Sequence, residues 1–169
     1  WIDLNNSATY AGVQTPTLTL NGLIVAMSGY QFRAVVSNGA SSSTPSPAAT
    51  LTVTPIGQTI AFGALAARTF GDAAFTLSAT ATSGLAVSFA ISNLGVATIN
   101  GNTITIVGAG TSAITVSQAG NATFSAATNV AQTLTVNKAS QMIAFGALAA
   151  KSVGNPAFTL GATATSGLG

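Results

Sequence analysis

The sequence predicts an all-β fold built from tandem β-sandwiches, and three observations predict it. Short runs in which apolar and polar residues alternate are separated by turn residues along most of the 169-residue chain. A segment that begins at Ile60 recurs from Ile143, which indicates a repeat array. Alanine, threonine, serine and glycine supply over half of the residues, and only 4% of the chain is charged.

The repeat aligns residues 60–85 with residues 143–168, and 20 of the 26 positions are identical. Two of the changes are mild, Arg68 to Lys151 and Asp72 to Asn155. Further strand-like runs follow the first copy, whereas the second copy reaches the end of the sequence. We therefore expect a complete repeat at residues 55–138 and the opening strands of a further repeat at residues 139–169.

Within the complete repeat, seven short runs have the composition and spacing of strands in a β-sandwich. The Ala-rich residues 61–67 also suit a helix, since Ala is the best helix former, but Gly63, Gly71 and the β-branched neighbours favour a strand. The expected strands are residues 58–62, 74–81, 86–91, 97–99, 103–107, 112–117 and 131–136.

A hairpin is predicted where Asn100 and Gly101 separate residues 97–99 from residues 103–105. Asn and Gly tolerate the positive φ angles that a two-residue hairpin loop requires. With this register we expect Ile104 and Val116 to point into the core.

The side chains present argue against catalysis and against bound cofactors or metals. The chain has no His, no Cys and no Glu, which supply most general bases, nucleophiles and metal ligands. Its two carboxylates, Asp3 and Asp72, are too far apart in the sequence to suggest a calcium cage. We therefore predict no catalytic residues, no cofactor-binding residues and no metal ligands.

The distribution of charge and hydropathy excludes two kinds of partner. Four Lys and Arg residues are scattered along a chain of net charge +2, so no basic patch for nucleic acid is expected. Polar residues interrupt every apolar stretch well before the roughly 18 residues that a membrane span requires. We predict no nucleic-acid partner and no membrane span in this segment.

Three runs in the complete repeat carry a family resemblance. Residues 87–93 (VSFAISN), 96–99 (VATI) and 107–116 (VGAGTSAITV) resemble, in this order, the bacterial immunoglobulin-like repeats of the group 2 type. The likeness covers residues 58–138. It implies tandem immunoglobulin-like β-sandwiches, whose usual contexts are adhesins, surface-layer proteins and other extracellular bacterial chains.

Residues 1–54 resemble a different type, the intermediate-set immunoglobulin-like domain. Trp1 stands where that family has the core Trp of the third strand, and residues 10–12, 18–20, 29–38 and 49–53 follow the family order. Ala34 replaces the second disulfide cysteine, and Phe32 replaces the corner Tyr. The resemblance implies the C-terminal part of an immunoglobulin-like domain whose opening strands are missing.

Two arrangements would complete the half-domains at the ends of the chain. Covalent neighbours in a longer repeat polymer would complete both. Alternatively, residues 141–168 would fill the opening-strand gap of residues 1–53 in the next subunit, as in strand donation. In either case an isolated piece exposes sheet edges.

Several residues are weak candidates for binding or modification. Trp1 and Tyr30, with Tyr10 at the rim, would suit sugar stacking, although aromatic residues at such positions usually belong to a core. Lys138 and Lys151 with Asn137, Asn155 and Asp72 contain the parts of an isopeptide crosslink, but solvated surface charge is the favoured interpretation. Asn5-Asn6-Ser7 and Asn121-Ala122-Thr123 match the glycosylation sequon, which often arises by chance.

Together these features predict a non-catalytic, extracellular or cell-surface bacterial protein that forms a stalk, fibre or self-assembling filament. Its expected partners are neighbouring repeats or subunits, end to end, because few charges oppose association. The alternatives are an adhesin segment that binds a surface glycan or host surface, and an accessory module of a larger secreted enzyme.

Overall fold

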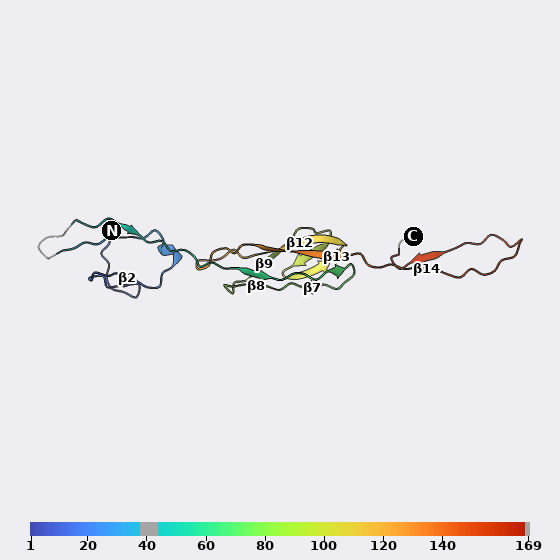
Figure 1. Ribbon diagram of the computed structural model, residues 1–169, viewed down its shortest axis with the longest axis horizontal. Coiled ribbons are helices and arrows are strands. Elements are labelled where there is room, and N and C mark those ends of the chain that lie inside the picture. Colours follow the sequence, from blue (N-terminus) through green and yellow to red (C-terminus); the bar gives the residue numbers. More distant parts are fainter. Residues whose placement is uncertain (38–43, 168–169) are drawn as a thin grey trace. The chain divides into compact units, whose positions relative to one another are not determined.

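The computed structural model describes residues 1–37 and 44–167 (Figure 1). These residues form several small β-sheets and one short 3-10 helix, η1 (Val25–Met27). The predicted all-β class is confirmed at this level. Within the described ranges, no helix is both long and apolar enough to cross a membrane.

Contacts between residues divide the chain into two compact units, which interleave along the sequence. The strands β9 (Ser88–Ile91), β12 (Gly110–Ser117) and β13 (Val130–Asn137) each contribute residues to both units. The first unit contains Trp1–Gly63, Ser78–Ala90 and Thr115–Gln132, and the second contains Ala64–Leu77, Ile91–Ile114 and Thr133–Gly169.

The N-terminal part of the first unit contains two antiparallel strand pairs. Strand β1 (Tyr10–Ala11) pairs with β2 (Thr19–Leu20), and β3 (Gln31–Phe32) pairs with β4 (Ala49–Thr50). The expectation that Trp1 belongs to a core is wrong, since its side chain is 66% exposed. Pairs of two-residue strands present too little sheet to cover an indole. Of residues 29–38, which follow the family order in the sequence, Gln31 and Phe32 form β3, and Asn38 lies outside the described residues.

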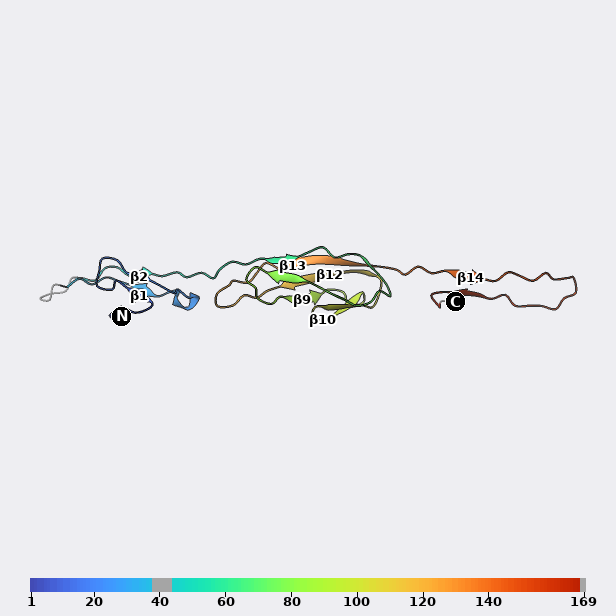
Figure 2. The same cartoon turned by 90° about the horizontal axis from the view of Figure 1, so that it is seen from below.

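The longest strands lie in a four-stranded sheet with the order β6-β13-β12-β9, in which β6 (Arg68–Thr69) runs parallel to β13. Strands β12 and β13 lie side by side in Figures 1 and 2. Alternate residues of both strands are buried, as the two-residue period of a strand requires. Ile114, Val116 and Leu134 are 0% exposed, which confirms the inward position expected for Val116.

A three-stranded sheet has the order β10-β11-β7 and contains the predicted hairpin. Strands β10 (Ala97–Asn100) and β11 (Thr103–Ile106) pair with Asn100 opposite Thr103, so the loop is Gly101–Asn102. Gly101 has a φ of 60°, as the first loop residue of a type II′ hairpin requires. The hairpin is confirmed, although Asn100 ends the strand and is not a loop residue. Ile104 is fully buried, as expected.

The expected single strand at residues 74–81 is two strands that pair in different sheets. Strand β7 (Phe75–Thr76) pairs with β11, whereas β8 (Ala79–Ala81) pairs with β5 (Ile60–Phe62). Between them, the Leu77 N–H donates to the Asn102 carbonyl at 2.8 Å. The segment 61–67 contains no helix, so the strand interpretation is confirmed for its start. Strand β6 was not expected from the sequence.

Candidate interaction surfaces

The two copies of the repeated segment form the same hairpin. In the first hairpin β5 pairs with β8, and in the second hairpin β14 (Ile143–Phe145) pairs with β15 (Ala162–Ala164). The second hairpin is the orange-to-red ribbon of Figure 2. Every paired position in one copy matches that in the other: Ile60 with Ala81 and Phe62 with Ala79 in the first, Ile143 with Ala164 and Phe145 with Ala162 in the second.

The hydrogen bonds that close each hairpin also recur. The hydroxyl of Thr82 accepts from the Thr59 N–H at 3.0 Å, and that of Thr165 accepts from the Met142 N–H at 2.9 Å. The backbone N–H groups of Thr82 and Thr165 donate to the carbonyls of Thr59 and Met142 in turn. The same local sequence therefore produces the same pair of closing hydrogen bonds in both hairpins.

A side-chain cap recurs in the turn within each copy. The Asp72 carboxylate accepts from the Thr69 N–H at 2.9 Å. In the second copy, the Asn155 side-chain oxygen accepts from the Ser152 N–H at 2.8 Å. The change from Asp to Asn keeps the acceptor that this turn uses.

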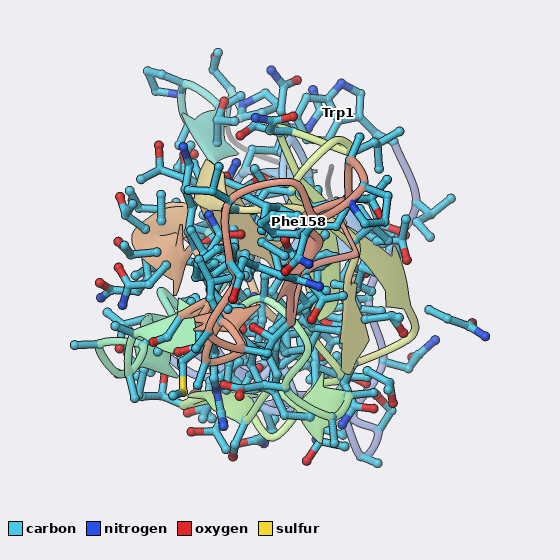
Figure 3. All side chains as sticks on the ribbon, turned by 90° about the vertical axis from the view of Figure 1, so that its right-hand side faces the viewer. Trp1 and Phe158 are labelled. Atoms are coloured by element: carbon cyan, nitrogen blue, oxygen red, sulfur yellow. The ribbon has the colours of Figure 1, made fainter. Side chains whose placement is uncertain are left out.

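Burial distinguishes the two copies. Ile60, Phe62 and Leu77 are at most 9% exposed in the first copy. Their counterparts are largely exposed: Ile143 at 75%, Phe145 at 56% and Leu160 at 58%. Phe158, labelled in Figure 3, is 52% exposed although the Lys151 ammonium lies 5.0 Å from its ring centroid. These exposed apolar side chains make the second hairpin a candidate interaction surface.

Residues after position 85 cover the first hairpin. The ring of Phe89 meets that of Phe62 edge to face at a centroid distance of 6.0 Å. The Gln132 side-chain amide donates to the Phe62 carbonyl at 3.1 Å. Ile104 pairs with Phe75, and the Asn102 amide donates to the Leu77 carbonyl at 3.2 Å. We call residues 86–137 the closing strands.

A buried polar cluster joins the start of the first hairpin to the closing strands. Gln58 is 8% exposed, and its amide donates to Gln118 Oε1 at 2.7 Å and to the Ser125 carbonyl at 2.6 Å. The Ser83 hydroxyl donates to Gln58 Oε1. This cluster was not expected from the sequence, although one signal was present: Gln58 and Ser83 recur as Gln141 and Ser166.

The aromatic candidates for glycan binding lie in the N-terminal part. The Arg33 guanidinium lies 4.3 Å from the ring centroid of Trp1, and Tyr30 is 49% exposed. Trp1 is labelled in Figure 3. Tyr10 is half-buried and packs edge-on against Phe32 at 6.3 Å, so little of its ring is free for stacking. Trp1 and Tyr30 therefore keep the larger accessible rings.

The candidate modification residues have local partners. The Lys151 ammonium lies over Phe158, while Asn155 and Asp72 cap their own turns. The Asn121 side chain accepts from the N–H groups of Thr123 and Phe124, so it organises a loop. Lys138, Asn137 and Asn5 are exposed.

In the described part of the chain, no group of three or more His, Cys, Asp or Glu residues is placed to hold a metal ion. The candidate surfaces among the described residues are the exposed second hairpin and the exposed rings of Trp1 and Tyr30. Searches against protein-family models, curated proteins and solved structures found no match to this chain.

Proposed function

We propose that this chain is a non-catalytic structural protein of the bacterial exterior, in which tandem immunoglobulin-like repeats form a stalk, fibre or self-assembling filament. The proposal keeps the division into residues 1–54, 55–138 and 139–169. The chain associates end to end with neighbouring repeats or subunits.

The observation that carries the proposal is the recurrence of one hairpin, with the same register and closing hydrogen bonds, in residues 60–81 and 143–164. A chain that repeats a structural unit of this kind builds length by stacking units, each in contact with its neighbours.

The surface chemistry supports association. The second hairpin presents Ile143, Phe145 and Leu160 to solvent. Only 4% of the chain is charged, so electrostatic repulsion between copies is weak. Apolar exposure with little repulsion favours contacts between molecules over a dispersed monomer.

Electron microscopy of the chain, with averaging along any fibre, tests this proposal. We expect fibres with a regular axial repeat. Phe145→Asp should raise the concentration needed for assembly about 10-fold or more, because fully burying a Phe contributes about 1.5–3 kcal/mol. Ala144→Asp adds the same charge at the neighbouring position of β14, whose side chain points to the other face, and should have a smaller effect.

Dispersed single chains at all concentrations would contradict the filament proposal. One observation favours a second candidate, an adhesin segment that binds a glycan, since Trp1 is 66% exposed beside Arg33. Stacking of sugar rings on exposed aromatic rings is the chemistry that such a site would use. Capture of the dispersed chain by immobilised glycans, lost in Trp1→Ala, would favour this candidate.

A further inference from the structure

We propose that the exposed face of the second hairpin is a docking surface for a second set of closing strands, a segment with the sequence pattern of residues 86–137. We define this face by Gln141, Ile143, Phe145, Phe158 and Leu160. The inference deepens the proposed end-to-end association, and it rests on that function for its biological context.

The first hairpin shows what such a face accepts. Its Phe62 meets the ring of Phe89 and receives a hydrogen bond from Gln132 at its carbonyl. Its Leu77 exchanges hydrogen bonds with Asn102 through both backbone groups. These contacts combine apolar packing with strand-edge hydrogen bonds, as in recognition by strand addition.

The second copy keeps the residues that this fit requires. The hairpin residues buried in the first copy recur unchanged, although the counterparts of the three largest are exposed and the counterpart of Ala81 is half-buried. They are Ile60, Phe62, Leu77 and Ala81, which recur as Ile143, Phe145, Leu160 and Ala164. Phe70 and Ala73, which are exposed in the first copy, become Val153 and Pro156. The buried pattern is thus intact in a hairpin that is not buried.

A polar feature of the face also matches the closing strands. Gln58 is satisfied in the first copy by Gln118 and by the Ser125 carbonyl, both from the closing strands. Gln141 stands at the same position and is exposed. A second set of closing strands would give the Gln141 amide the same two acceptors and would fix the register of docking.

The numbers of hairpin segments and closing-strand segments in the sequence indicate which occupant the face needs. Residues 1–169 contain the hairpin sequence twice and the closing-strand sequence once. Suppose that the closing strands of one copy docked on the second hairpin of another copy. They would then leave their own first hairpin, which would become exposed. The area buried would not change, so exchange provides no driving force and an additional set of closing strands is required.

Residues 1–53 are a poorer occupant. Their paired strands are two residues long, whereas β12 and β13 of the closing strands are eight residues long. Their sequence also has no counterpart of the runs at 87–93 and 107–116. The proposal therefore commits to a segment like residues 86–137.

The test appends residues 86–138 directly after Leu168, the counterpart of Leu85, and compares this extended chain with the unextended one. Hydrogen exchange is followed by mass spectrometry in peptides that contain Met142 or Pro156, which occur in the second copy alone. We expect amide exchange in β14 and β15 to slow by about 100-fold or more in the extended chain. Strands that are docked in a sandwich exchange only when a larger part of the structure unfolds, which costs more free energy.

The matched control carries Ile104→Asp and Leu134→Asp in the appended segment alone, because both positions are fully buried in the first repeat. This variant should give no added protection. Peptides that contain Thr59 report the first hairpin and should keep their protection in every sample, which shows that the rest of the chain is folded.

Protection from the unaltered extension, absent from the control, supports the proposal. Equal exchange in the extended, control and unextended chains would overturn it. Protection of β14 already present in the unextended chain, together with protection of residues 1–53, would also overturn it in favour of strand donation. Microscopy of the unextended chain, in which the face stays exposed, separates this inference from the filament proposal. Protection in the extended chain without fibres of the unextended chain rejects the filament alone, whereas unchanged exchange in the extended chain rejects the docking surface whether or not fibres form.

Discussion

Residues 60–81 and residues 143–164 form the same hairpin in two different environments. Both have one register, one pattern of closing hydrogen bonds and a side-chain cap in the turn. Phe62 is 7% exposed in the first hairpin, whereas Phe145 is 56% exposed in the second. The backbone of the hairpin therefore follows from its own sequence, and burial follows from the strands that come after it.

This difference separates local from non-local contributions to stability. Turn geometry and caps act within each hairpin and should have similar energies in both copies. Packing against the closing strands acts in the first copy alone, so substitutions of apolar residues should have unequal effects. The predictions below compare matched positions in the two hairpins.

The largest expected difference is between Phe62→Ala and Phe145→Ala. Phe62 is buried against Phe89, so its truncation should lower the free energy of unfolding of the complete repeat by about 3–5 kcal/mol. Phe145→Ala should change it by no more than about 0.5 kcal/mol, as at other exposed sites. Urea unfolding of the full chain, followed by circular dichroism, measures both values. Equal losses in the two variants would mean that the second hairpin is buried as well.

The sequence predicted the parts of the fold that depend on near neighbours. The strands of residues 97–117 and the hairpin at Gly101 follow from alternation and turn chemistry, and Ile104 and Val116 point inward as expected. Alternation alone also favours one strand at 74–81. That segment splits because Leu77 bonds to Asn102, a partner far along the chain that no local pattern reveals.

The candidate surface was predicted only in part. The repeat itself indicated that sheet edges would be exposed at residues 141–168. The roles of Gln58 and Gln118 depend on a contact across the repeat, so they could not be derived from spacing. The expected core position of Trp1 is wrong, because it was inferred from family order and requires strands that cover the indole ring. Strands β1 and β2 are only two residues long, and Trp1 is 66% exposed.

A smaller effect, equal in both copies, is expected at the hairpin glycines. Gly84 and Gly167 have φ angles of 75° and 71°, and an added Cβ would meet nothing within 4 Å at either. Replacement by Ala should therefore cost only the left-handed backbone penalty, about 1–2 kcal/mol. Hydrogen exchange at Thr82 and Thr165 should accelerate by about 5- to 30-fold in the respective variants.

Gly63→Ala and Gly146→Ala are the matched controls for this pair. Both positions are open and lack a positive φ, so these variants should not accelerate exchange. A much larger effect at Gly84 than at Gly167 would show that the closing strands, and not the turn alone, constrain this position.

The smallest effect concerns the turn cap, where the two copies already differ. Asp72→Asn should leave the stability of the complete repeat within about 0.5 kcal/mol, because Asn155 makes the same bond to Ser152 with an amide oxygen. Asp72→Ala removes the acceptor for the Thr69 N–H and should cost about 0.5–1 kcal/mol. Urea unfolding of the two variants separates these outcomes. A loss in Asp72→Asn equal to that in Asp72→Ala would show that the carboxylate charge, and not the side-chain acceptor, stabilises the turn, so the two hairpins would not share this feature after all.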